Sequence, residues 1–150
     1  MSYSIKTITK NDLYLLKPLW QKLNEIHLSD SPHFKDFYKT FTFEQRIVSF
    51  DTIIPDNMLI QIVEDAGKIF GFCISAITNE TGEIESLFLE ESVRGINLGE
   101  TLCRNAIDWM KKRITQTHHQ SYLNLIKQYP VNIPRYHQAD ILSIYKFHSA

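Results

Sequence analysis

Apolar residues along the chain recur with the spacing of helices in two long segments. The first runs over Asn11–His27, and the second follows Gly99 and continues to Ile114. In both segments apolar side chains return every three or four positions, which is typical of a helix with one buried face. The first stripe consists of Leu13, Leu16, Leu19, Trp20, Leu23 and Ile26, and the second of Leu98, Leu102, Ala106, Met110 and Ile114. We therefore expect two amphipathic helices, the first preceded by a capping box formed by Thr9 and Asp12.

Shorter apolar runs predict the strands. They are Ser4–Ile8, Met58–Val63, Ile69–Ile77, Glu83–Leu89, Tyr122–Ile126 and Ile141–Phe147. Glu64–Lys68 and Thr78–Gly82 have the composition of hairpin turns. The aromatic stretch Phe34–Phe50 predicts one or two short helices. This order of elements predicts an α/β domain with a mixed sheet.

Composition and charge narrow the class of protein. With 150 residues, 43% hydrophobic and 22% charged, the chain suits one globular domain over residues 1–150. A formal net charge of −1 gives no attraction to nucleic acid or an anionic membrane, so neither is expected as a partner. Cys73 and Cys103 lie in apolar segments, outside any CxxC pair, and read as buried free thiols of a reducing compartment. Without an apolar leader or a long apolar run, the expected location is the cytoplasm.

The segment with the clearest chemistry is the turn Arg94-Gly95-Ile96-Asn97-Leu98-Gly99, between a strand and a helix. Unpaired N–H groups and the helix dipole make such a turn a site for phosphate or pyrophosphate, and glycine permits close approach. Arg94 adds a forked cation at the rim. The segment is neither a P-loop nor a Rossmann turn, because it has neither motif. A connection with glycines used only for turning is the alternative interpretation.

This turn, together with Glu85-Ser86-Leu87-Phe88-Leu89 before it, resembles the signature R-G-x-G-x-G of the GNAT N-acetyltransferases. Asn97 replaces the middle glycine, and asparagine tolerates the left-handed backbone that this position requires. The resemblance implies a mixed, mostly antiparallel sheet of the α+β type with helices on both faces, acetyl-CoA as cosubstrate, and, from the habit of the family, a homodimer. It further implies that pantetheine lies along Leu87, Phe88 and Leu89, and that pyrophosphate contacts the N–H groups of Arg94, Gly95, Ile96, Asn97, Leu98 and Gly99. Thr101 is either a phosphate ligand or a helix-end residue.

Acetyl transfer to an amine needs a proton acceptor and a donor for the leaving thiolate. Glu83 and Glu85 are expected to share one face of their strand. We expect Glu85 to be the base, because an acidic residue is frequent there in the family, and Glu83 to bind the substrate. Tyr136 is the candidate acid, although Asp140 departs from the family motif around it. A solvated strand face and a surface aromatic are the plainer alternatives.

The acceptor side is expected near His27 and Phe34, in the region that covers the acceptor site in this family. His118-His119 has no third ligand at a suitable spacing, so no metal is expected. The sequence thus favours direct transfer of an acetyl group from acetyl-CoA to a primary amine on a small molecule, a peptide N-terminus or a lysine. A non-catalytic acyl-CoA-binding regulatory module, or an interaction domain that has lost the coenzyme, are the alternatives.

Overall fold

The computed structural model describes residues 2–30, 35–79 and 81–117. The elements in chain order are β1 (Ser4–Ile8), the 3-10 helix η1 (Lys10–Leu16), α1 (Lys17–Asp30), α2 (Lys35–Thr40), α3 (Phe43–Val48), η2 (Pro55–Asn57), β2 (Met58–Asp65), β3 (Lys68–Thr78), β4 (Thr81–Leu89), η3 (Glu91–Val93) and α4 (Leu98–Thr117). The predicted strands Tyr122–Ile126 and Ile141–Phe147 lie outside the described residues.

The described strands form one antiparallel sheet in the order β1-β2-β3-β4. The hairpin between β2 and β3 turns at Ala66 and Gly67, whose φ angles of 50° and 79° are both left-handed. Two left-handed residues are what a tight hairpin with matching twist requires. The hairpin between β3 and β4 turns at Asn79, with a φ of 49°. Both hairpins predicted from the sequence are confirmed.

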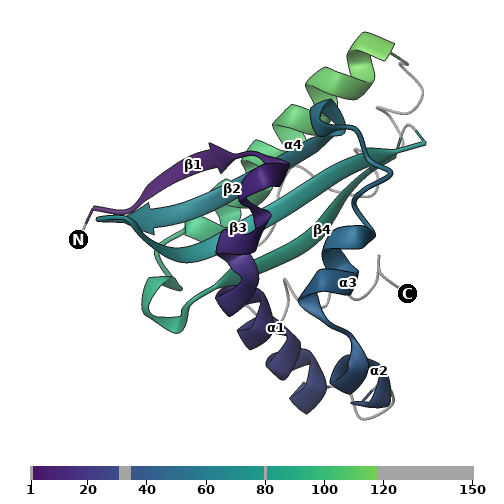
Figure 1. The fold of residues 1–150 in the computed structure, drawn as a ribbon. Helices are drawn as coiled ribbons and strands as arrows, with labels where there is room; N and C mark the ends of the chain where they lie inside the picture. The colour runs from purple at the N-terminus through teal and green to yellow at the C-terminus, as the bar shows by residue number, and fades with distance from the viewer. Residues whose placement is uncertain (1, 31–34, 80, 118–150) are drawn as a thin grey trace.

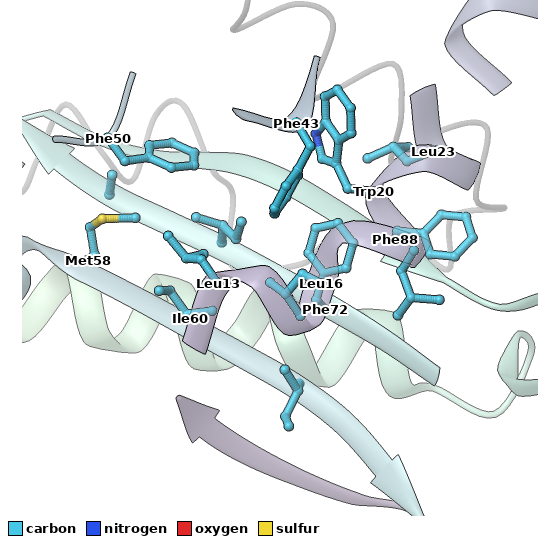
Figure 2. Close-up of a cluster of buried hydrophobic side chains, with 14 residues drawn as sticks. Leu13, Leu16, Trp20, Leu23, Phe43, Phe50, Met58, Ile60, Phe72 and Phe88 are labelled. Atoms are coloured by element: carbon cyan, nitrogen blue, oxygen red, sulfur yellow. The ribbon is translucent and has the colours of Figure 1, made fainter. Parts of the chain in front are cut away.

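Helices cover both faces of this sheet (Figure 1). On one face η1, α1 and α3 enclose an aromatic cluster with β2, β3 and β4 (Figure 2), and among the described residues α4 is the long helix that covers the other. The aromatic cluster contains Leu13, Leu16, Leu19, Trp20, Leu23, Phe43, Phe50, Met58, Ile60, Ile62, Phe72, Ile74, Ala76 and Phe88. The α4 cluster contains Val63, Cys73, Ile77, Ile84, Leu87, Leu89, Val93, Leu102, Cys103, Ala106, Ile107, Met110 and Ile114. The α/β layout with helices on both faces is therefore confirmed.

The first predicted helix is corrected in its first half. Residues 10–16 form a 3-10 helix, and the α-helix begins only at Lys17. Pro18 is the reason, because an α-helix running through it would place its ring against the carbonyl of Tyr14. Instead the Lys17 N–H donates to the Tyr14 carbonyl with 3-10 spacing. Leu13 and Leu16 are still buried, so the apolar stripe survives the change of helix type.

One buried amide fixes α4 against the sheet. Gln61 of β2 is 2% exposed, and its Nε2 donates to the Leu102 carbonyl of α4 at 3.0 Å. Asn105, one turn further along α4, donates through Nδ2 to Gln61 Oε1 at 3.0 Å. Because buried polar groups are costly unless paired, this network favours one axial position of α4. The N-terminus of α4 is thereby held close to the end of β4.

Candidate functional site

The turn before α4 has two left-handed residues separated by one. Gly95 has a φ of 77° and Asn97 a φ of 66°. Glycine adopts this conformation at little cost, and asparagine is among the residues that tolerate it best. Asn97 thus keeps the backbone bend at the position where the family signature has glycine. Ile96 between them is 52% exposed.

The main-chain N–H groups of this turn are free to bind an anion. Within residues 2–30, 35–79 and 81–117, those from Gly95 to Glu100 donate no hydrogen bond, and the first bond of α4 runs from Thr101 N to Asn97 O at 3.0 Å. Free N–H groups at a helix start point toward its N-terminal end, where the helix dipole adds positive potential. This turn therefore offers the kind of donors that a phosphate or pyrophosphate would need.

Two side chains of the turn are engaged with the protein itself. Arg94 Nε donates to the Leu89 carbonyl at 3.0 Å, so this arginine fastens the turn to the end of β4. The Thr101 hydroxyl donates to the Asn97 carbonyl at 2.9 Å, and in this arrangement it acts as a helix-end residue. Main-chain groups, more than these side chains, face the space beyond the helix.

A fixed cation lies one turn further along α4. Glu100, in the first turn, would repel an anion. Arg104 contacts its Oε1 through Nε at 3.0 Å and Nη2 at 2.7 Å. The pair cancels the carboxylate charge beside the anion site.

The outer edge of β4 offers main-chain groups for a second part of a ligand. β4 is the last strand in the described sheet. The Glu90 N–H donates to the Phe70 carbonyl of β3 at 2.8 Å, so by alternation Phe88 also pairs inward, while Leu87 and Leu89 present their N–H and C=O groups outward. Arg94 occupies the Leu89 carbonyl. Among the described residues, the main-chain groups of β4 left open at this end are those of Leu87 and the Leu89 N–H.

β4 contains a bulge at Glu85. Ile74 of β3 pairs with Ser86, and the next residue Ser75 pairs with Ile84, so Glu85 is the extra residue. A bulge shifts by one residue the alternation of side chains between the two faces of the sheet. Glu83 consequently lies opposite Ala76 and faces the aromatic cluster, whereas unbroken alternation from Leu87 would have placed it beneath α4. The shared face predicted for the two glutamates exists, and the bulge determines which face it is.

Arg46 of α3 holds the bulge. Its Nη2 donates to the Glu85 carbonyl at 2.8 Å and to Glu85 Oε2 at 3.1 Å. The two side chains are 14% and 20% exposed. The guanidinium also lies over the ring of Phe50, with Cζ 4.7 Å from the ring centroid. Figure 1 shows α3 lying beside β4, and the Arg46 side chain spans the two elements.

Glu83 has a different environment. Its carboxylate makes no hydrogen bond or ion pair with any described residue. Partial burial, and then the negative charge of Glu85, raise the pKa of Glu83 above its usual value. The structure thus places two carboxylates on one face, one bound by arginine and one unbound.

Of the other predicted site residues, His27 is the one that the structure describes. His27 lies in the last turn of α1 and is 3% exposed. Phe34 and Tyr136 lie outside the described residues, as does His118-His119. In the described part of the chain no cluster of three or more His, Cys, Asp or Glu is suited to a metal, and no helix has the length and apolarity to cross a membrane.

Sequence reasoning missed Arg46 and Gly71. Arg46 follows Thr42-Phe43-Glu44-Gln45, and the capping box of Thr42 and Gln45 was a readable signal for a helix start. No local pattern connects that helix with β4, which lies far along the chain. Gly71 reads as an ordinary strand glycine, and only the pairing of β3 with β4 shows its close approach to Leu89.

Comparison with known proteins agrees with this geometry. Residues 20–130 match the acetyltransferase (GNAT) family. The chain therefore belongs to the GNAT family of acetyltransferases, as the resemblance of the turn implied. The sequence matches no curated protein significantly.

Solved structures share the fold at low sequence identity. The PaiA N-acetyltransferase from Thermoplasma acidophilum, in complex with coenzyme A, has a TM-score of 0.54 and 20% identity over 75% of this chain and 74% of that one. A GNAT family acetyltransferase from Staphylococcus aureus gives 0.57 and 21% over 74% and 92%. YncA from Salmonella typhimurium, solved with acetyl-CoA, gives 0.55 and 17% over 77% and 66%.

Proposed function

We propose that this chain transfers an acetyl group from acetyl-CoA directly to a primary amine. One observation carries the proposal: the free N–H groups from Gly95 to Glu100 lie at the start of α4, next to the open edge of β4. A pyrophosphate and an extended amide-containing arm need this combination of donors. Two similar structures were solved with coenzyme A or acetyl-CoA, which supports this choice of ligand.

The coenzyme would lie along two elements. Its pyrophosphate would accept hydrogen bonds from the turn, where Arg94, Gly95, Ile96, Asn97, Leu98 and Gly99 contribute main chain, with Thr101 at the rim. Its pantetheine arm would pair with the outer edge of β4 at Leu87 and Leu89, while Phe88 supports that edge from inside the sheet. In this arrangement the thioester would point toward the carboxylates of Glu83 and Glu85.

The reaction then needs one proton acceptor and one donor. The lone pair of a neutral amine attacks the thioester carbonyl carbon, so that a C–N bond forms and the C–S bond breaks. The nitrogen proton passes to a carboxylate of β4, directly or through water, and the electron pair of the C–S bond remains on sulfur. Tyr136 is our candidate for protonating that thiolate, and water is the alternative donor.

The acceptor is an amine on a small molecule, a peptide N-terminus or a lysine. Carboxylates on the face of the aromatic cluster would attract such a cation before it loses its proton. The segment from the end of α1 through α2, which includes His27 and Phe34, is the proposed cover of the acceptor.

Two measurements test the proposal. Calorimetry with coenzyme A should show binding that Gly99→Val abolishes, because a branched side chain would occupy the place of closest approach to the anion. Release of the CoA thiol from acetyl-CoA, measured with a panel of primary amines, should then show turnover. Binding without turnover would favour a regulatory acyl-CoA-binding module. Unchanged affinity of Gly99→Val would place the coenzyme elsewhere.

A further inference from the structure

The two carboxylates of β4 differ in what holds them, although one strand carries both. Arg46 occupies an oxygen of Glu85, and its second hydrogen bond fastens the main chain of the same residue. The Glu83 carboxylate lies on the same face without such a partner among the described residues. A carboxylate oxygen that already accepts from a guanidinium has fewer open acceptor positions for the proton of an amine.

Arg46 is itself held in place from several directions. The Thr42 carbonyl accepts from the Arg46 N–H at 3.1 Å, and the Ser49 hydroxyl donates to the Arg46 carbonyl at 2.6 Å. Lys10 of η1 donates to the carbonyls of Phe50 and Ile53 at 2.8 and 2.7 Å, which fixes the segment after α3. The guanidinium therefore meets the bulge from a rigid support.

We propose that Arg46 is a positioning residue that holds the β4 bulge and reserves Glu85 as its counter-ion, so that Glu83 is the carboxylate that accepts the proton of the amine. The inference rests on the proposed function. It differs from the sequence expectation, which preferred Glu85 as the base. The proton moves from the attacking nitrogen to a Glu83 oxygen, and no other co-reactant is required.

The charges around Glu83 determine how its pKa responds to substitution. Glu85 lies on the same strand as Glu83 and is paired with Arg46 of α3, and β3 contributes the uncharged Ala76 opposite Glu83. The charge of Glu85 raises the pKa of Glu83, so Glu85→Gln should lower that pKa. Arg46→Met should raise it, because the charge of Glu85 is then no longer compensated. A base must be ionised, so activity is lost as pH falls through its pKa.

The experiment is a pH profile of amine acetylation by the full chain. Glu83→Gln should lower kcat by about 100-fold or more, the usual scale for losing a general base, while coenzyme affinity stays intact. Glu85→Gln should lower kcat by less than about tenfold and move the acid limb of the profile to lower pH. Arg46→Met should move the limb to higher pH. Arg46→Lys should return the acid limb to the pH of the parent, because lysine keeps the positive charge. It should not return kcat to the value of the parent, because lysine lacks the forked donors of the guanidinium.

The matched control is Glu44→Gln. Glu44 lies in α3, two residues before Arg46, and pairs with Lys17 instead of the sheet. Its removal should leave both kcat and the pH profile unchanged, with thermal unfolding used to confirm that all variants fold. If Glu44→Gln moved the acid limb by as much as the Arg46 variants do, the effect of Arg46 would be a general effect of charge and not of its contact with Glu85.

The opposite result is clear. Loss of about 100-fold in Glu85→Gln, with full activity in Glu83→Gln, would overturn the assignment while leaving the proposed acetyl transfer in place. If the parent protein acetylates no amine, the proposed function fails instead. In that case NMR titration of the Glu83 carboxyl still decides the role of Arg46. A pKa of Glu83 that falls in Glu85→Gln and rises in Arg46→Met supports it, and one that stays constant in both overturns it.

Discussion

Gly71 of β3 and Leu89 of β4 are register partners, and a Cβ on Gly71 would lie 2.4 Å from Leu89 Cδ2 and 2.8 Å from Phe88 O. The leucine side chain can move aside, but the carbonyl belongs to the main chain of β4. A residue larger than glycine would push the end of β4 outward. That end is where we place the pantetheine arm, so the glycine supports the site without touching the coenzyme.

We predict that Gly71→Ala lowers the free energy of unfolding by about 1–3 kcal/mol, the usual cost of overpacking, and weakens coenzyme A binding. Gly67→Ala is the control. It has open space around its Cβ, and its φ of +79° alone should cost about 1 kcal/mol. Urea denaturation and calorimetry would measure both effects. If Gly71→Ala bound coenzyme A with the affinity of the parent, the end of β4 could move outward without weakening the site.

The second prediction concerns Asn97 and its φ of 66°. Asn97→Gly should bind coenzyme A as well as the parent does, since glycine adopts the same conformation. Asn97→Val should raise Kd by roughly tenfold, because a left-handed residue with a branched side chain costs about 1–2 kcal/mol, and binding must restore that turn. Equal affinities of the two variants, measured by calorimetry, would mean that the turn does not have to be preformed.

The third prediction concerns Ser86, which follows the bulge. Its Oγ is buried and has no hydrogen-bond partner among the described residues. Ser86→Ala removes this unsatisfied group and should raise the free energy of unfolding by about 1 kcal/mol. Equilibrium urea denaturation would measure the change. A loss of stability of that size would instead indicate that the hydroxyl has a bound water whose hydrogen bonds are worth keeping.

The fourth prediction concerns the two free thiols. Burial raises the pKa of Cys103 to about 12 and that of Cys73 further. Neither should react with a thiol reagent at pH 8 in the folded protein, and both should react after unfolding in urea. Since these pKa values are raised by folding, the stability they contribute is complete below the ordinary thiol pKa of about 8.5 and declines as pH rises above it. Fast labelling of either native thiol would contradict this.

The sequence was sufficient to predict the structure wherever the residues of one short segment determine its conformation by themselves. The stripe from Leu98 to Ile114 predicted α4, because a helix buries one face whatever lies against it. The left-handed turn followed from Gly95 and Asn97 for the same local reason. The 3-10 form of η1 was equally readable in principle, because Pro18 forbids an α-helix through Tyr14, but the apolar stripe was given more weight.

Features that depend on pairing between distant segments could not be predicted in this way. Nothing in Ile84-Glu85-Ser86 distinguishes a bulge from regular strand, since the extra residue is defined by the register with β3. Arg46 and Glu85 are separated by 39 positions, so their contact exists only once α3 packs beside β4. The relation between the two carboxylates therefore had to come from the structure.

The bulge at Glu85 also bears on how this gene can vary in length. If β4 kept all its residues and lost the bulge, regular alternation would carry Glu83 to the opposite side, beneath α4. Loss of the Glu85 codon would also restore regular alternation, but it would leave Glu83 opposite Ala76 on the face of the aromatic cluster. The score of a sequence alignment would change little with such a deletion, because the residue types on both sides of it stay the same. Within this family, then, an acidic residue of one member corresponds to that of another only when the two have the same partner on β3, whatever the number of residues between each and the end of its strand.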